Sequence, residues 1–196
     1  MRVDISEGDS SDLSGYAAVS IAFEVREMFS LVVSDGGLGG IQFALQQLEL
    51  PYLKDYDAEP GNHPTEWRAH HDTTSWGVLE ARSEGSRVGG AVIAWQTPKV
   101  DLLEGRADLA VLWDLRVAVG MRGKGVGAAL FRKAERWAGA RRARYLKVET
   151  QNVNVPACRF YASRGCELGA VHRFAYPAFP AEVQLFWYKR LAPSAV

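Results

Sequence analysis

Residues 119–130 read VGMRGKGVGAAL and place four glycines and two cationic side chains in one short stretch. Glycine loses more backbone entropy on folding than any other residue, so such a cluster indicates unusual dihedral angles or the close approach of a ligand. The preceding residues 109–119, LAVLWDLRVAV, are a β-branched and aliphatic run typical of a buried strand. Residues 124–139 have the spacing of an amphipathic helix, whose apolar face would carry Val126, Leu130, Ala134 and Trp137. The loop therefore joins a strand to a helix N-terminus, where free N–H groups and the helix dipole favour an anion.

Three phosphate-binding patterns compete for this loop. The nucleoside-triphosphate pattern G-x-x-x-x-G-K-[ST] fails, because Val126 and Gly127 follow Gly125 where Lys and a hydroxyl are needed. The dinucleotide pattern G-x-G-x-x-[GA] fits Gly123, Gly125 and Ala128, but it opens the first unit of a domain, and more than a hundred residues precede it here. The pattern [RQ]-x-x-G-x-[GA] fits Arg122, Gly125 and Gly127 directly. A glycine turn required only for packing also stays open at this point.

Length and composition favour one cytoplasmic domain. The chain has 196 residues and 47% hydrophobic composition, enough for one core, so we expect a single domain over 1–196 with a loose lead-in over 1–15. Its 23 acidic and 23 basic residues balance, which argues against a nucleic-acid or membrane partner. We expect neither a signal peptide nor a membrane span. Cys158 and Cys166 suit reduced thiols, not a disulfide or a zinc site.

The expected elements follow from hydrophobic periodicity. Residues 18–33 favour a strand, with a helix left open, 38–50 support either element, and 51–75 form a long irregular segment. The segments predicted as strands are 75–82, 87–97, 109–119, 144–150, 166–176 and 182–190, and a second helix is predicted over 155–165. Strands 109–119 and 144–150 flank a helix and should be parallel neighbours through a right-handed crossover. The fold class is therefore mixed α/β.

A second motif follows the loop at a characteristic distance. Residues 148–166 read VETQNVNVPACRFYASRGC, in which Asn154, Ala157, Tyr161 and Gly165 match N-x-x-A-x-x-x-Y-x-x-x-G-F apart from Cys166 in place of Phe. Together with the loop, this pattern resembles the GNAT superfamily of N-acetyltransferases. Residues 50–190 further resemble its streptothricin acetyltransferase branch, through PYLKDYD, VETQ, NVPAC and VQLFWY. The resemblance implies a single GNAT-like domain with a central twisted mixed sheet, a splayed parallel strand pair and flanking helices.

The resemblance also implies a function. The expected enzyme is an acetyl-CoA-dependent N-acetyltransferase that acts on a primary amine of a small molecule, such as a streptothricin-like antibiotic, and needs no metal. Two alternatives remain: acetylation of a protein N-terminus or lysine, and a CoA-binding module without catalysis. The sequence leaves a homodimer open.

Site residues are assigned through the same resemblance. Leu115, Arg116 and Val117 would present the strand main chain to the pantetheine arm, and Asn154 would hold that arm. Tyr161 would protonate the departing thiolate, a suitable task for a phenol whose pKa lies near 10. The pyrophosphate would contact the loop residues Arg122, Gly123, Lys124, Gly125, Val126, Gly127 and Ala128.

The general base has two candidates, Glu149 at a strand end and Asp114 on the strand before the loop, with a slight preference for Glu149. Other polar groups are interpreted as solvated loop residues, namely His63, His70, His71 and Asp72, and the acidic Asp55, Asp57 and Glu59. Aromatic side chains that either wall an acceptor pocket or belong to the core are Tyr52, Tyr56, Trp113, Phe186, Trp187 and Tyr188.

Overall fold

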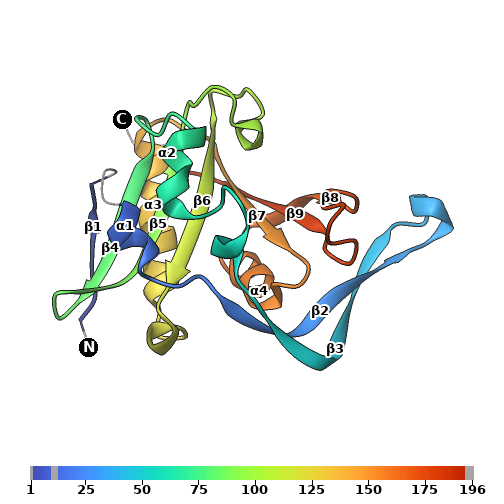
Figure 1. Cartoon of the computed structure of the whole chain (residues 1–196). Coiled ribbons are helices and arrows are strands. Elements are labelled where there is room, and N and C mark those ends of the chain that lie inside the picture. The colour runs from blue at the N-terminus through green and yellow to red at the C-terminus, as the bar shows by residue number, and fades with distance from the viewer. Residues whose placement is uncertain (1, 10–12, 193–196) are drawn as a thin grey trace. The chain divides into compact units, whose positions relative to one another are not determined.

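The computed structural model describes residues 2–9 and 13–192 (Figure 1). These residues divide into two compact units. The first unit contains the described residues of 1–22, 55–148 and 188–196. The second contains residues 23–54 and 149–187.

The first unit is built on a mixed sheet. Its strands lie in the order β1-β4-β5-β6-β7. Neighbours are antiparallel from β1 to β6, whereas β6 and β7 are parallel. This confirms the predicted mixed α/β fold and the parallel crossover pair. The strand bounds are β1 Asp4–Glu7, β4 Gly77–Ser83, β5 Ser86–Ala94, β6 Leu109–Val117 and β7 Tyr145–Gln151, whose last residues belong to the second unit.

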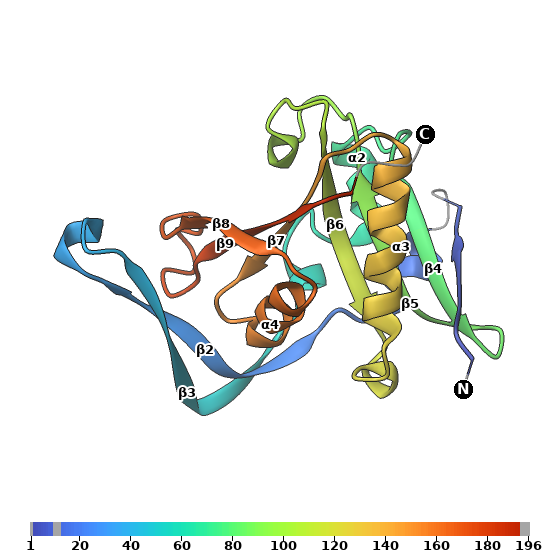
Figure 2. The ribbon, with the colours of Figure 1, turned by 180° about the vertical axis from the view of Figure 1, so that it is seen from behind.

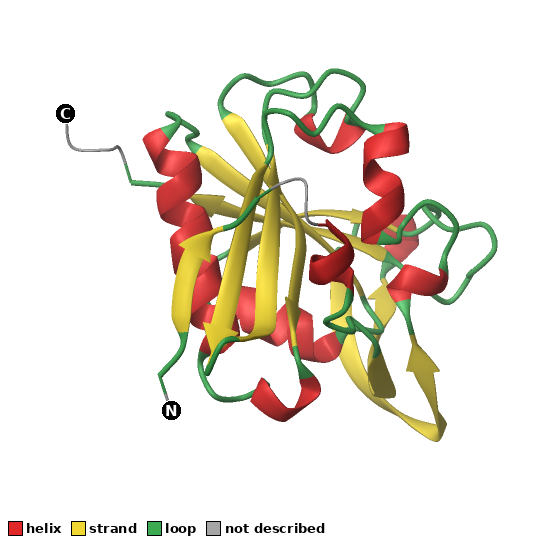
Figure 3. Ribbon diagram, turned by 60° about the vertical axis from the view of Figure 1, so that its left-hand side comes forward, coloured by secondary structure: helices red, strands yellow, loops and turns green. Residues whose placement is uncertain are grey.

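Helices cover both faces of that sheet. Consecutive glycines of β5 point to opposite sides: a Cβ on Gly89 would meet Leu130 of α3, and one on Gly90 would meet Tyr16 of α1. Figures 2 and 3 show α3 on one face, and Figure 1 shows α1 and α2 in front of the other. The apolar face predicted for the main helix is confirmed as buried. The helix bounds are α1 Leu13–Ala17, α2 Trp67–His70 and α3 Val126–Ala140.

The second unit contains a long hairpin, one helix and part of the main sheet. Strands β2 and β3 pair antiparallel as a separate two-stranded sheet, while β9 lies between β7 and β8. A small core joins Cys158 of α4 to Val183 and Leu185, with Phe29 and Phe43 of the hairpin packed against it. The bounds are β2 Phe23–Val33, β3 Ile41–Lys54, α4 Val155–Ser163, β8 Glu167–His172 and β9 Gln184–Arg190, which ends in the first unit.

Several expected boundaries differ from the structure. Residues 4–7, expected in a loose lead-in, pair with β4 as strand β1, which is too short to show a periodicity. The two ambiguous segments form strands over residues 23–33 and 41–50, and residues 51–54 extend β3 instead of starting the irregular loop. The strand before the glycine loop ends at Val117, because a 3-10 turn follows over Val119–Met121. The expected lead-in also includes residues 1 and 10–12, which lie outside the described residues.

Cys158 and Cys166 are both free and buried. In the described part of the chain, no helix is both long enough and apolar enough to cross a membrane.

Candidate functional site

The glycine loop leaves its main chain open at the start of α3. Gly123 and Gly125 have φ of +74° and +85°, in the left-handed region that favours glycine. A Cβ on either residue, or on Gly120, would meet no other atom within 4 Å, so neighbouring side chains do not require these glycines. Gly125 is the N-cap of α3 and its N-terminus has no side-chain cap. The N–H groups of Val126, Gly127 and Ala128 therefore remain available at a positive helix end, which fits a pyrophosphate.

Arg122 braces the loop instead of pointing freely outward. Its Nε donates to the carbonyl of Val117 at 3.0 Å, and its Nη2 donates to that of Ala22 at 2.9 Å. Burial lowers the pKa of its guanidinium. Both Arg122 and Lys124 belong to the exposed residues, but only Arg122 is tied to main-chain carbonyls. The side chain of Arg122 thus fixes the path of the loop, while Lys124 has the freedom expected of a side chain that pairs with phosphate.

The edge of β6 that faces β7 is paired over only part of its length. The parallel register joins Leu109–Leu112 to Tyr145–Val148, and it stops there. On the other edge, pairing with β5 continues to Val117, with a bulge at Trp113 between Leu112 and Asp114. The described parallel ladder thus ends at Leu112, and the pairing of Leu115 and Val117 with a pantetheine arm stays a prediction.

The guanidinium group of Arg116 forms all of its hydrogen bonds within the first unit. Nε and Nη2 contact the two carboxylate oxygens of Asp114 at 2.9 and 2.8 Å, and Nη1 and Nη2 contact those of Asp57 at 2.8 and 3.0 Å. Nη1 also donates to the carbonyl of Val19 at 3.1 Å, so all five N–H groups are used. Burial opposes this charge, but the carboxylates raise the pKa of the guanidinium above its usual value. We call this group of residues the Arg116 clasp.

The clasp changes how Asp114 and Asp57 are understood. Tyr16 donates a short hydrogen bond to Asp114, and burial, followed by the charge of Asp114, raises the pKa of the Tyr16 phenol well above its usual value. Both oxygens of Asp114 are thus occupied, which leaves it poorly placed to accept a proton from a substrate amine. Asp57, interpreted from the sequence as a solvated loop residue, instead fixes the Tyr56–Ala58 turn to β6 through Arg116.

The second unit holds Asn154, Tyr161 and Glu149. Asn154 is the N-cap of α4, and its Oδ1 accepts from the N–H of Ala157 at 3.1 Å. Its amide group therefore keeps two N–H donors for other contacts. Tyr161 lies on α4 and is 7% exposed, with its ring 5.1 Å from that of Phe160. The Asn–Tyr motif consequently combines a helix cap with a buried phenol.

Glu149 is held by two neighbours that the sequence did not identify. Tyr176 donates to its Oε1 at 2.5 Å, and the Gln151 Nε2 donates to the same oxygen at 3.1 Å and to the Tyr176 hydroxyl at 2.7 Å. No described residue donates to the Glu149 Oε2. Tyr176 lies 27 residues further along the chain in a turn, where no motif marks it. Glu149 therefore has a fixed carboxylate with one open oxygen, whereas Asp114 has none.

The histidine-rich segment packs against aromatic rings. His71 stacks on Trp76 with ring centroids 5.8 Å apart and meets Trp113 edge-on at 5.0 Å. Burial, and then the charge of His70, lowers the pKa of His71, so the ring is neutral near pH 7. Within the described residues, no three histidine, cysteine or acidic side chains gather as metal ligands would. His71 and Trp113 thus form an aromatic surface beside the bulge in β6.

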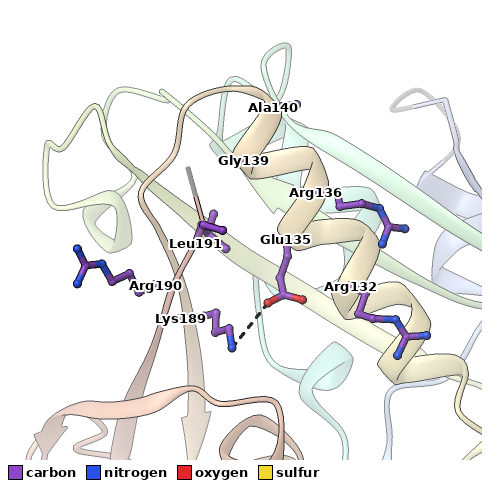
Figure 4. A pocket seen from close by; sticks show the side chains of 9 residues that line it. Arg132, Glu135, Arg136, Gly139, Ala140, Lys189, Arg190 and Leu191 are labelled. Carbon is purple, nitrogen blue, oxygen red and sulfur yellow. Dashed lines mark ion pairs between the residues drawn. The ribbon is translucent and has the colours of Figure 1, made fainter. Parts of the chain in front are cut away.

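A hollow of about 590 Å³ lies at the other end of α3 and contains none of the predicted site residues. It is lined mainly by Arg132, Glu135, Arg136, Lys189 and Arg190 (Figure 4). Lys189 and Glu135 approach to 4.0 Å, whereas the arginine side chains point away from that pair. Because the cations diverge, this hollow lacks the converging charges of an anion site.

Comparison with known proteins assigns the family. The profile described as the Acetyltransferase (GNAT) family matches residues 42–166, well over half of the chain. The chain belongs to the GNAT acetyltransferase family. It is 32% identical over 171 residues to a streptothricin acetyltransferase of Escherichia coli, covering 85% of this chain and 84% of that relative. This GNAT protein is therefore an acyltransferase of the streptothricin acetyltransferase branch, as its sequence motifs predict.

Solved structures agree on the fold of this GNAT acetyltransferase. A crystal structure of nourseothricin acetyltransferase superposes with a TM-score of 0.75 at 21% identity, covering 98% of this chain and 100% of that one. A Bacillus anthracis protein assigned as a streptothricin acetyltransferase, crystallised in complex with acetyl coenzyme A, gives 0.74 at 23% identity, covering 97% and 100%. At these identities the likeness shows the fold alone.

Proposed function

We propose that this protein transfers the acetyl group of acetyl-CoA to a primary amine of a small, cationic antibiotic of the streptothricin class. The observation that carries the proposal is the glycine loop, with three open main-chain amides at a helix start and space where Cβ atoms would stand. The name and extent of the Escherichia coli relative support the acceptor class. When bound, acetyl-CoA supplies an activated thioester carbonyl to the acceptor amine.

In this proposal the first unit binds the nucleotide part of acetyl-CoA. The amides from Gly123 to Ala128 donate to the pyrophosphate, Lys124 pairs with its charge, and Arg122 keeps the loop in position. Leu115, Arg116 and Val117 contribute main-chain groups to the pantetheine arm, while the Arg116 side chain stays in its clasp. Asn154 donates its free amide hydrogens to the same arm.

Proton transfer in this proposal uses two residues of the second unit. Glu149 accepts a proton from the ammonium group of the acceptor, directly or through one water, with Tyr176 and Gln151 fixing its orientation. Tyr161 donates its phenolic proton to the thiolate that leaves, which suits two groups of similar basicity. We assign Asp114 a positioning role because its oxygens are occupied.

The proposed residues are divided between both units, so we propose that the chain acts as one acetyltransferase domain. We also propose that it acts in the cytoplasm, where free thiols such as those of Cys158 and Cys166 stay reduced.

A CoA-thiol release assay tests the function. Purified protein with acetyl-CoA is offered streptothricin, other small amines, and peptides with free N-termini or lysines. We expect streptothricin to give a kcat/KM at least a hundredfold above every peptide. Faster turnover of peptides would identify a protein acetyltransferase. Tight acetyl-CoA binding with no turnover on any amine would indicate a binding module without catalysis.

A further inference from the structure

Exposed apolar side chains concentrate on the β2–β3 hairpin. Among the described residues, ten large apolar side chains are highly exposed, and seven of them lie between residues 32 and 53. Leu38 at the tip is 92% exposed, Leu50 is 85% and Leu53 is 71%. The other four, between 41% and 50% exposed, are Val32, Ile41, Leu45 and Tyr52. Exposed apolar residues are normal when scattered, but so many on one element indicate an interaction surface.

The outer part of the same hairpin, residues 28–47, lacks the features that protect strand edges. Residues 28–48 contain one charged side chain, Asp35, and no proline. Within the described chain, β3 pairs with β2 alone, so its second edge is open. On the β2 side, Asn152 covers the edge at Phe29 through two hydrogen bonds. Natural proteins usually protect an open edge with lysine, proline or a bulge. The Ile41–Gln47 part of β3 has none of these, whereas a bulge that contains Pro51 follows over residues 48–51.

We propose that β3 of this chain docks against β3 of a second copy. The segment 41–47 of each copy would pair antiparallel across a two-fold axis, with Ala44 opposite its own copy, extending two hairpins into one four-stranded sheet. In that register Leu38 at the tip of one copy comes near Leu50 of the other, so the two most exposed leucines approach each other. The open edge of β3 over residues 41–47 carries no charge that would attract a charged partner. The same edge of a second copy has the same uncharged side chains and the same strand pattern.

The exposed apolar area of the hairpin, on its two faces and its tip, is comparable with one side of a standard interface. With on the order of 150–200 Å² for a fully exposed large side chain, the seven residues present roughly 600–800 Å² per copy. A standard protein interface buries about 800 Å² from each partner. The hairpin would therefore gain backbone partners along β3 and partial cover for the apolar side chains next to that edge.

Sedimentation equilibrium tests the proposal with matched variants. At about ten micromolar we expect the wild type to have twice the mass of one chain. Leu45→Lys should raise the dimer dissociation constant at least tenfold, because it places a charge beside the apolar Phe43 of the other copy. Val119→Lys, an equally drastic change at an exposed apolar residue of the first unit, should leave the mass unchanged.

A second pair of variants distinguishes loss of the dimer from misfolding. Ala44 is exposed and lies opposite its own copy in this register, so Ala44→Lys should keep the thermal melt of the wild type and still weaken the dimer by like-charge repulsion. Ser86→Lys, an exposed strand position of the first unit, is its control. The proposal is overturned if the wild type stays monomeric at about 100 micromolar. The same holds if that monomer binds lipid vesicles or another protein through the hairpin instead. Dimers that persist in both hairpin variants, or controls that dissociate equally, overturn it as well.

Discussion

Glu149 and Asp114 carry the same functional group in opposite surroundings. Asp114 is buried, with Arg116 on both oxygens and Tyr16 on one. Glu149 is held through Oε1 alone. A carboxylate inside a full set of charge-assisted hydrogen bonds stabilises the fold, while one with an open oxygen can exchange a proton. Replacing the carboxylate by an amide should therefore change turnover at Glu149 and stability at Asp114.

Glu149→Gln should lower kcat by about a hundredfold or more, because it removes the proposed base. The thermal midpoint should stay within a few degrees of the wild type, since glutamine keeps the size and can still accept from Tyr176. Steady-state kinetics with streptothricin as the acceptor measures the loss. An unchanged kcat would assign the base to another group.

Asp114→Asn should act mainly on stability. It breaks a buried ion pair and leaves Arg116 with Asp57 alone, which costs about 3 kcal/mol of unfolding free energy. For a chain of this size we expect the midpoint to fall by about 10 °C in calorimetry. Asp101→Asn, an exposed carboxylate, is the control. If Asp114→Asn melts like the wild type but loses its turnover, then Asp114 is the base.

Sequence patterns located these carboxylates but not their environments. Glu149 was a candidate because it lies at a strand end, and Asp114 because it lies on the strand before the glycine loop. The partners that distinguish them, Asp57, Tyr16 and Tyr176, are 27 to 98 residues away in the chain. Contacts of that kind depend on tertiary packing, which a single sequence does not encode in any local period.

The helix α4 begins at a residue with two proposed tasks. Asn154 caps the helix through Oδ1, and we propose that its N–H groups bind the pantetheine arm. Asn154→Ser should keep the cap and change the unfolding free energy by a few tenths of a kcal/mol. The dissociation constant for acetyl-CoA, measured by calorimetry, should rise about tenfold, the usual effect of losing one or two hydrogen bonds.

Asn154→Ala is the companion variant. It removes the cap as well and should destabilise the protein by about 1 kcal/mol. If Asn154→Ser binds acetyl-CoA as the wild type does, the residue serves only as a helix cap.

At the level of elements, local periodicity was informative where one face of a segment is buried. The β6–α3–β7 crossover and the helix α4 match their predictions, because their apolar faces repeat regularly. The hairpin strands were ambiguous because apolar residues occupy both faces, as in Leu45 and Val32. Strand β1 was missed because its four residues gain their order from β4.

The whole chain has a formal net charge of zero, and its exposed large apolar side chains are concentrated on the β2–β3 hairpin. Balanced charge gives no long-range attraction for a polyanion, so recognition must come from local groups. The proposed site residues come from both units, and each proposed step acts on bound acetyl-CoA. Binding of acetyl-CoA is therefore the property on which every proposed step depends.

Calorimetric titration of acetyl-CoA into the wild type and Gly127→Val tests the central claim most directly. Gly127 lies in the first turn of α3, where valine is tolerated in a helix but would stand where phosphate oxygens are expected. We expect Gly127→Val to melt within a few degrees of the wild type, a loss of about 1 kcal/mol or less. Its affinity for acetyl-CoA should fall by about a hundredfold or more, about 3 kcal/mol. Normal acetyl-CoA binding by folded Gly127→Val would show that the loop is a packing turn and contradict the assigned site.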